Sequence, residues 1–174
     1  GPAALAGVVA VTAWKLGLNT IKSMRQADFE IQTGPRYFDI LNEFLVFLAH
    51  VADRYAYARL SGEERAACTT AMALRLAELT AENQSRLLGG DAGELKQRFV
   101  DLFNRRGEDY SCFGFDPADG PDFGFGRFLG NVLLDLVPPR DRSWVIDQVM
   151  AIEIPDAVKT LGNVFAGLEA SSAA

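Results

Sequence analysis

Apolar residues recur three or four positions apart along almost the whole chain, and no stretch sustains the alternation of a strand beside a hairpin turn. This spacing predicts helices over residues 3–27, 35–60, 62–88, 92–106, 123–137, 139–152 and 155–168. No internal repeat or linker divides them. We therefore expect a single all-α domain over residues 1–174, an irregular helical bundle of six to seven helices.

Local signals mark the predicted helix boundaries. Ser61 and Glu64 have the spacing of a capping box before the third helix, and Asp91 and Glu94 repeat it before the fourth. Proline or glycine pairs separate the other helices, and Pro155 is expected to end the sixth helix and begin the seventh.

The second predicted helix is the most apolar element of the chain. Its apolar positions form a continuous stripe at helical spacing, which Ile40 and Phe47 widen beyond a normal amphipathic face. Such a helix is typical of the centre of a bundle. Its excess of apolar residues also suggests a surface for a protein partner, including a second copy in a homodimer.

The segment from Gly107 to Gly126 breaks the helical pattern and is predicted to be a long loop between the fourth and fifth helices. Five acidic residues and no basic residue occur between positions 108 and 126. The acidic residues are Glu108, Asp109, Asp116, Asp119 and Asp122, and the phenylalanines are Phe113, Phe115, Phe123 and Phe125.

Three interpretations of this loop remain open. Asp116, Asp119 and Asp122 could bind calcium, although their spacing is not that of an EF-hand. The aspartates and phenylalanines could instead capture a basic partner protein. Alternatively, the loop is a structural crossover in which the aromatic rings enter the core, the acids stay in water and Asp122 caps the next helix.

Composition narrows the function classes. The chain has 174 residues, of which 49% are hydrophobic, so it can form a core and global disorder is excluded. With 17 basic against 23 acidic residues, the net charge of −6 argues against a nucleic-acid-binding protein. Two cysteines are too few for a disulfide framework, which favours the bacterial cytoplasm.

The residues at both ends of the chain also allow structural predictions. Gly1 and Pro2 are typical of the remnant left when a protease removes a tag. The apolar run from Ala3 to Val11 is expected to be part of a buried helix, because it is too short to span a bilayer. A membrane partner is not expected unless an anchor was removed upstream, and residues 169–174 are expected to be a frayed tail.

The only histidine, His50, lies on the second predicted helix. Glu43, His50, Asp53 and Tyr57 fall on one side of that helix and could bind a common ligand. No Glu-x-x-His motif or zinc spacing accompanies them, so no metal or cofactor is expected. The alternative is a polar seam in which His50 pairs with a carboxylate and Arg54 pairs with Glu43 or Asp53.

Motifs of nucleophilic and nucleotide chemistry are absent or incomplete. There is no Gly-x-Ser-x-Gly elbow and no Walker A sequence, and the glycines after Asp122 follow no predicted strand. The sequence therefore favours a non-enzymatic interaction protein, such as an adaptor, chaperone or regulator. The alternative is a helical small-ligand or metal-binding protein, enzyme or not, with a polar cluster on the second helix.

Overall fold

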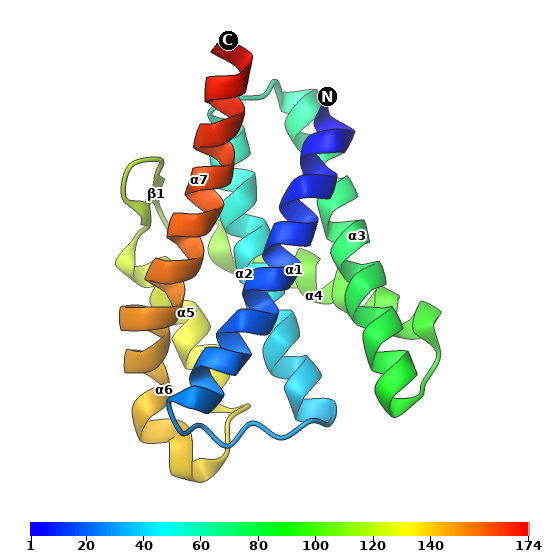
Figure 1. Cartoon of the computed structure of the whole chain (residues 1–174), viewed down its shortest axis with the longest axis vertical. Helices are drawn as coiled ribbons and strands as arrows, with labels where there is room; N and C mark the ends of the chain where they lie inside the picture. Colours follow the sequence, from blue (N-terminus) through cyan, green and yellow to red (C-terminus); the bar gives the residue numbers. More distant parts are fainter. Residues whose placement is uncertain (174) are drawn as a thin grey trace.

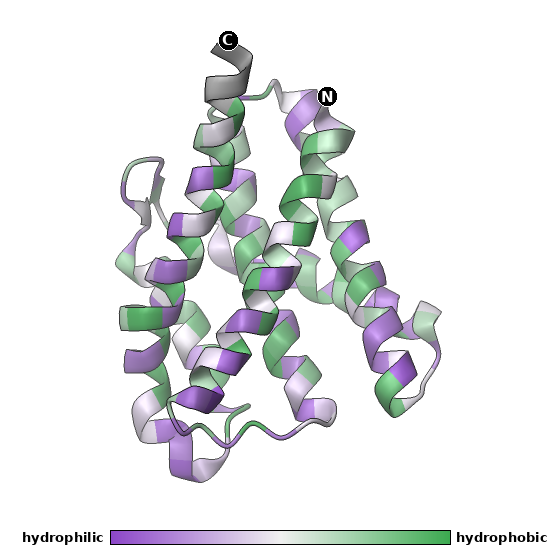
Figure 2. Ribbon diagram, viewed as in Figure 1, coloured by the Kyte–Doolittle hydropathy of each residue, from purple (hydrophilic) through white to green (hydrophobic). Residues whose placement is uncertain are grey.

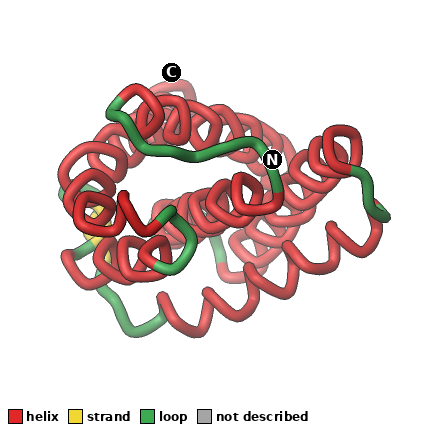
Figure 3. Tube along the Cα trace, turned by 90° about the horizontal axis from the view of Figure 1, so that it is seen from below, coloured by secondary structure: helices red, strands yellow, loops and turns green. Residues whose placement is uncertain are grey.

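Over residues 1–173, which the computed structural model describes (side chains through Leu168), the chain forms seven α-helices and one pair of two-residue strands (Figure 1). The α-helices are α1 (Pro2–Gln26), α2 (Pro35–Tyr57), α3 (Gly62–Leu88), α4 (Ala92–Tyr110), α5 (Phe123–Leu134), α6 (Arg142–Gln148) and α7 (Ile154–Ala173). The strands are β1 (Phe115–Asp116) and β2 (Gly120–Pro121). Helices make up nearly all of the trace, which confirms the all-α bundle (Figure 3).

The second helix lies at the centre of the bundle. It packs against α1, α3, α4, α5 and α7, and its apolar residues are buried on almost every side. Phe38, Leu41, Leu45 and Leu48 are each at most 1% exposed. Because these neighbours cover α2, its apolar excess forms the core, and the expected apolar docking face on this helix is wrong.

The predicted helix starts are confirmed by their hydrogen bonds. The Ser61 hydroxyl accepts from the backbone N–H of Glu64, and the Glu64 carboxylate accepts from the backbone N–H of Ser61. Asp91 caps α4 by accepting from the backbone N–H of Glu94. These caps satisfy backbone donors that have no partner within the helix.

The fourth helix is longer than predicted, because Gly107 lies inside it. A side chain at this position would place its Cβ 3.1 Å from Cε1 of His50. Gly107 therefore lets α4 approach α2 closely without crowding His50, and it does not end the helix. The loop shortens to residues 111–122.

Pro155 does not separate the last two helices. A 3₁₀ turn (Pro139–Asp141) leads into α6, and a π-helical turn (Val149–Glu153) joins α6 directly to α7. Pro155 occupies the second position of α7 and has no backbone N–H to donate, and the wider π turn accommodates it.

The first helix packs on α2 and α3 through small residues. Gly17 meets Leu41 and Leu45 of α2 so closely that a Cβ would lie 2.8 Å from Leu45. The N-terminal half of α1 is mostly apolar and its C-terminal half carries the polar residues (Figure 2). By length and composition α1 could cross a membrane, and 39% of its most apolar window is buried in the fold.

The backbone of α7 continues to Ala173, and residue 174 lies outside the described residues. The frayed tail expected over residues 169–174 stays a prediction.

Candidate functional site

The connection between α4 and α5, residues 111–122 (the hairpin segment), forms a small antiparallel hairpin. Phe115 pairs with Pro121, and Asp116 pairs with Gly120. Gly120 has a φ of +81° and lies against Val158 of α7, with room for no side chain. A left-handed glycine thus turns the hairpin and lets it approach α7.

The three aspartates of this segment have different hydrogen-bond partners. Asp122 caps α5, since its carboxylate accepts from the backbone N–H of Phe125 at 2.9 Å and from that of Gly114 at 2.8 Å. Asp116 accepts from the backbone N–H groups of Ala118 and Asp119 and so fixes the turn. The Asp119 carboxylate remains in solvent with its charge available.

The four phenylalanines differ in how deeply they are buried. Phe125 is fully buried and stacks on Tyr110, with ring centroids 4.8 Å apart, so it cannot act as a docking anchor. Phe113 and Phe115 are partly buried against the core. Phe123, by contrast, is 72% exposed. Burial thus rules out the anchor role predicted for Phe125, and Phe123 is the one of the four rings that is largely exposed.

A groove of about 590 Å³ (the hairpin groove) lies between the hairpin segment and α7. Its floor is apolar and includes Tyr55, Met150 and Ile154, while Asp119, Asp122, Phe123 and Lys159 border it. Gly162 allows α7 to approach the Tyr55 hydroxyl closely. The groove thus combines an apolar floor with exposed carboxylates and one exposed aromatic ring.

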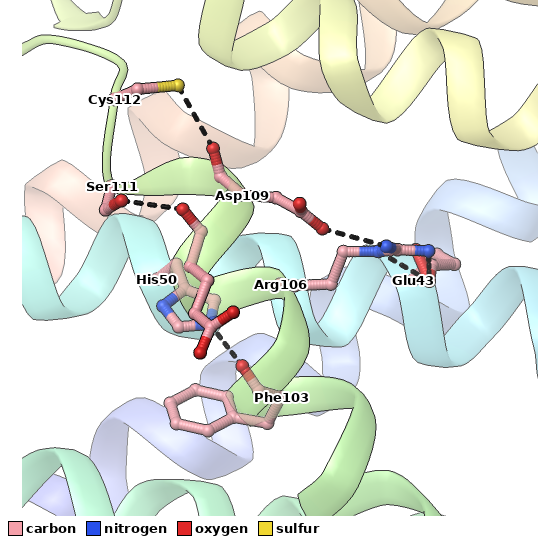
Figure 4. Close-up of polar contacts among 8 residues, drawn as sticks. Glu43, His50, Phe103, Arg106, Asp109, Ser111 and Cys112 are labelled. Carbon is pink, nitrogen blue, oxygen red and sulfur yellow. Dashed lines mark hydrogen bonds and ion pairs between the residues drawn. The ribbon is translucent and has the colours of Figure 1, made fainter.

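Glu43 is separated from the other candidate residues on α2. Glu43 is 3% exposed and pairs with Arg106 of α4, whose Nε lies 3.1 Å from both carboxylate oxygens. Arg106 also donates to Asp109 at 3.0 Å, as Figure 4 shows. Burial raises the pKa of Glu43, and the hydrogen bond from Arg106 opposes that shift.

Asp53 forms a separate pair with α3. Arg65 donates from Nε at 2.9 Å and from Nη2 at 2.7 Å, and the Thr69 hydroxyl adds a third bond at 2.7 Å. Burial alone would raise the pKa of Asp53, but the bonds from Arg65 and Thr69 lower it. The carboxylate is therefore ionised and fully engaged at neutral pH.

His50 pairs with a carbonyl rather than with a carboxylate. Its Nε2 lies 2.9 Å from the Phe103 oxygen, and its ring stacks on the Phe103 ring at 4.3 Å (Figure 4). A carbonyl only accepts, so Nε2 carries the proton. Burial lowers the pKa of His50, against the effect of the Phe103 bond. The imidazole is neutral at pH 7.

Arg54 lies beside His50, Asp53 and Tyr57, and its partners differ from those predicted from the sequence. It was expected to pair with Glu43 or Asp53, yet it donates to the carbonyls of Tyr110 at 2.8 Å and Phe113 at 2.9 Å. It thereby caps the C-terminal end of α4 and ties the hairpin segment to α2. Only its position one turn after His50 could have signalled this role.

A second hollow, of about 710 Å³, does bring three of the four α2 candidates together. His50, Asp53 and Tyr57 line it with Arg54, Arg65 and Phe115, and we call it the His50 hollow. Glu43 lies outside it and borders a different hollow. Among the described residues, no group of three or more His, Cys, Asp and Glu side chains is placed to hold a metal ion.

No family model matches the chain, and neither the curated proteins nor the solved structures include a significant match to it.

Proposed function

We propose that this chain is a non-catalytic protein-interaction module that receives a segment of a partner protein in the hairpin groove. The observation that carries the proposal is the 72% exposure of Phe123 at the rim of a groove whose floor is apolar. An exposed aromatic ring beside a hollow is the composition that interface anchors have.

The charge of the groove favours a partner with a basic residue. Asp116, Asp119 and Asp122 are exposed, and residues 108–126 contain no basic residue that would neutralise them. Two carboxylates, those of Asp119 and Asp122, and one amine, that of Lys159, line the groove, so its charge is negative. A partner that places Lys or Arg over the hairpin and an apolar side chain on the floor would match both features.

The test is selection from a random peptide library displayed on phage, with the intact chain immobilised. We expect the selected peptides to combine Lys or Arg with a neighbouring large apolar residue. Phe123→Ala should weaken their binding by about tenfold, because it removes the anchor. Asp119→Asn should reduce the association rate and its dependence on salt.

Trp144→Ala is the matched control, since Trp144 is similarly exposed at 67% but borders a different hollow. Equal binding by the Phe123→Ala variant, or selected peptides without basic residues, would contradict the proposal. The homodimer stays a prediction, which the native mass of the chain at micromolar concentration will check.

A further inference from the structure

Hydrogen bonds to the surrounding protein fix the polar side chains that line the His50 hollow. His50 is bonded to the Phe103 carbonyl, Arg54 to the Tyr110 and Phe113 carbonyls, and Asp53 to Arg65 and Thr69. Side chains fixed in this way need no reorganisation when a ligand arrives.

His50 presents an unused acceptor there. Because Nε2 donates to Phe103, the lone pair of the neutral ring is on Nδ1. That nitrogen points away from Phe103 and Arg106 in Figure 4, and the hydrogen bond described for the ring is the one at Nε2. A ligand can therefore satisfy it with an O–H or N–H donor.

The charge of the hollow is positive in a chain of net charge −6. Arg54 and Arg65 face the single carboxylate of Asp53, which Arg65 already binds through two nitrogens. Both guanidinium groups keep further N–H donors beyond the bonds described. These donors favour an anionic group, and carboxylate geometry suits a guanidinium well.

Aromatic rings form the remaining walls. Tyr57 is 68% exposed and lies under the Arg65 guanidinium, with 4.6 Å from Cζ to the ring centroid. Phe115 borders the hollow from the hairpin segment and packs edge-on against Tyr55. Flat apolar surfaces on two sides suit a flat ligand.

We propose that the His50 hollow is a second binding site, for a small planar organic acid that also carries a hydroxyl or amide donor. The carboxylate binds at Arg65 and Arg54, the ring lies between Tyr57 and Phe115, and the donor bonds Nδ1 of His50. The polar groups that bind this acid lie on α2 and α3, and none of them borders the hairpin groove.

The probe is 4-hydroxybenzoate, titrated into the intact, isotope-labelled chain while the imidazole nitrogens are observed by NMR. Because the chain has one histidine, these signals report on His50 alone. We expect the Nδ1 signal to shift and saturate with a dissociation constant of about 1 mM. Benzoate, without the hydroxyl, should leave Nδ1 nearly unshifted, and 4-hydroxybenzyl alcohol, without the charge, should bind about tenfold more weakly.

Variants separate this site from the hairpin groove. Tyr57→Ala, at an exposed position that should not affect folding, should weaken binding about tenfold, whereas Phe123→Ala should leave it unchanged. An unmoved Nδ1 signal, equal binding of the uncharged alcohol, or full affinity in Tyr57→Ala would overturn the proposal.

Discussion

Within the core, the hydroxyl of Tyr110 has no hydrogen-bond partner among the described residues. The side chain is 1% exposed and its ring contacts Phe47, Phe125 and Phe128. Burial raises the pKa of Tyr110 far above its usual value, so the hydroxyl stays protonated. An unpaired buried hydroxyl costs about 1–3 kcal/mol.

Removal of this hydroxyl should therefore not harm the fold. We expect Tyr110→Phe to raise the free energy of unfolding by about 1 kcal/mol, because the ring contacts remain and the unpaired group is lost. Denaturant unfolding followed by circular dichroism measures the change. A loss of about 1 kcal/mol would instead show that the hydroxyl has a partner in solution.

Glu153 is a buried carboxyl whose described bonds come from neutral groups. Its Oε2 accepts from the Ser23 hydroxyl and from Nε2 of Gln148, both at 2.8 Å, and the residue is 4% exposed. Burial raises the pKa of Glu153, and these two bonds oppose the shift. The folded chain therefore binds this proton more tightly than the unfolded chain does.

Because the pKa of Glu153 is raised, its contribution makes the free energy of unfolding fall as the pH rises. Below the ordinary pKa of 4.5, both states are protonated and Glu153 carries no penalty. As the pH rises from there through the raised pKa, the unfolded state loses its proton first, so stability falls.

We expect Glu153→Gln to melt at a higher temperature than the parent chain at pH 7, because the amide oxygen can accept both bonds without a charge. The difference should vanish below pH 4.5. Thermal unfolding of both proteins across this range tests it, and a lower melting temperature for the variant at pH 7 would contradict it.

At the scale of elements, the contact between α2 and α4 depends on the absence of a side chain at position 107. His50 already stacks on Phe103 and donates to its carbonyl, so its ring cannot retreat without losing these contacts. Alanine inside a helix is normally more stable than glycine by about 1 kcal/mol. At this position the crowding of His50 opposes that gain.

We expect Gly107→Ala to destabilise the chain by about 1 kcal/mol and to shift the imidazole signals of His50. Gly7→Ala is the control, because Gly7 lies in α1 with open space around its Cβ position, and it should stabilise by about 0.5–1 kcal/mol. Stabilisation by both substitutions would show that α4 can move away from α2.

At the scale of the whole molecule, the helices were predictable because their signals are local. The caps at Ser61 and Asp91 act over three residues, and apolar spacing repeats with each turn. The pairing of side chains was not predictable. Glu43 and Arg106 are 63 residues apart, and Arg54 and Phe113 are 59 apart, and no periodic pattern links them.

The separation of Glu43 from the other α2 candidates could not be predicted, for a related physical reason. Glu43, His50 and Asp53 share one side of α2, but this helix is surrounded, so that side faces two neighbours. Glu43 and His50 meet α4, while Asp53 meets α3. Periodicity assigns a residue to a face, and only the packed fold decides which neighbour that face meets.

One residue of the hairpin segment, Pro117, borders both the hairpin groove and the His50 hollow. The hairpin is thus a shared wall, and a displacement that widens one space changes the shape of the other. Thermodynamic linkage then makes the two sites reciprocal. If a peptide in the groove alters the affinity for an organic acid by some factor, the acid alters the affinity for the peptide by that same factor.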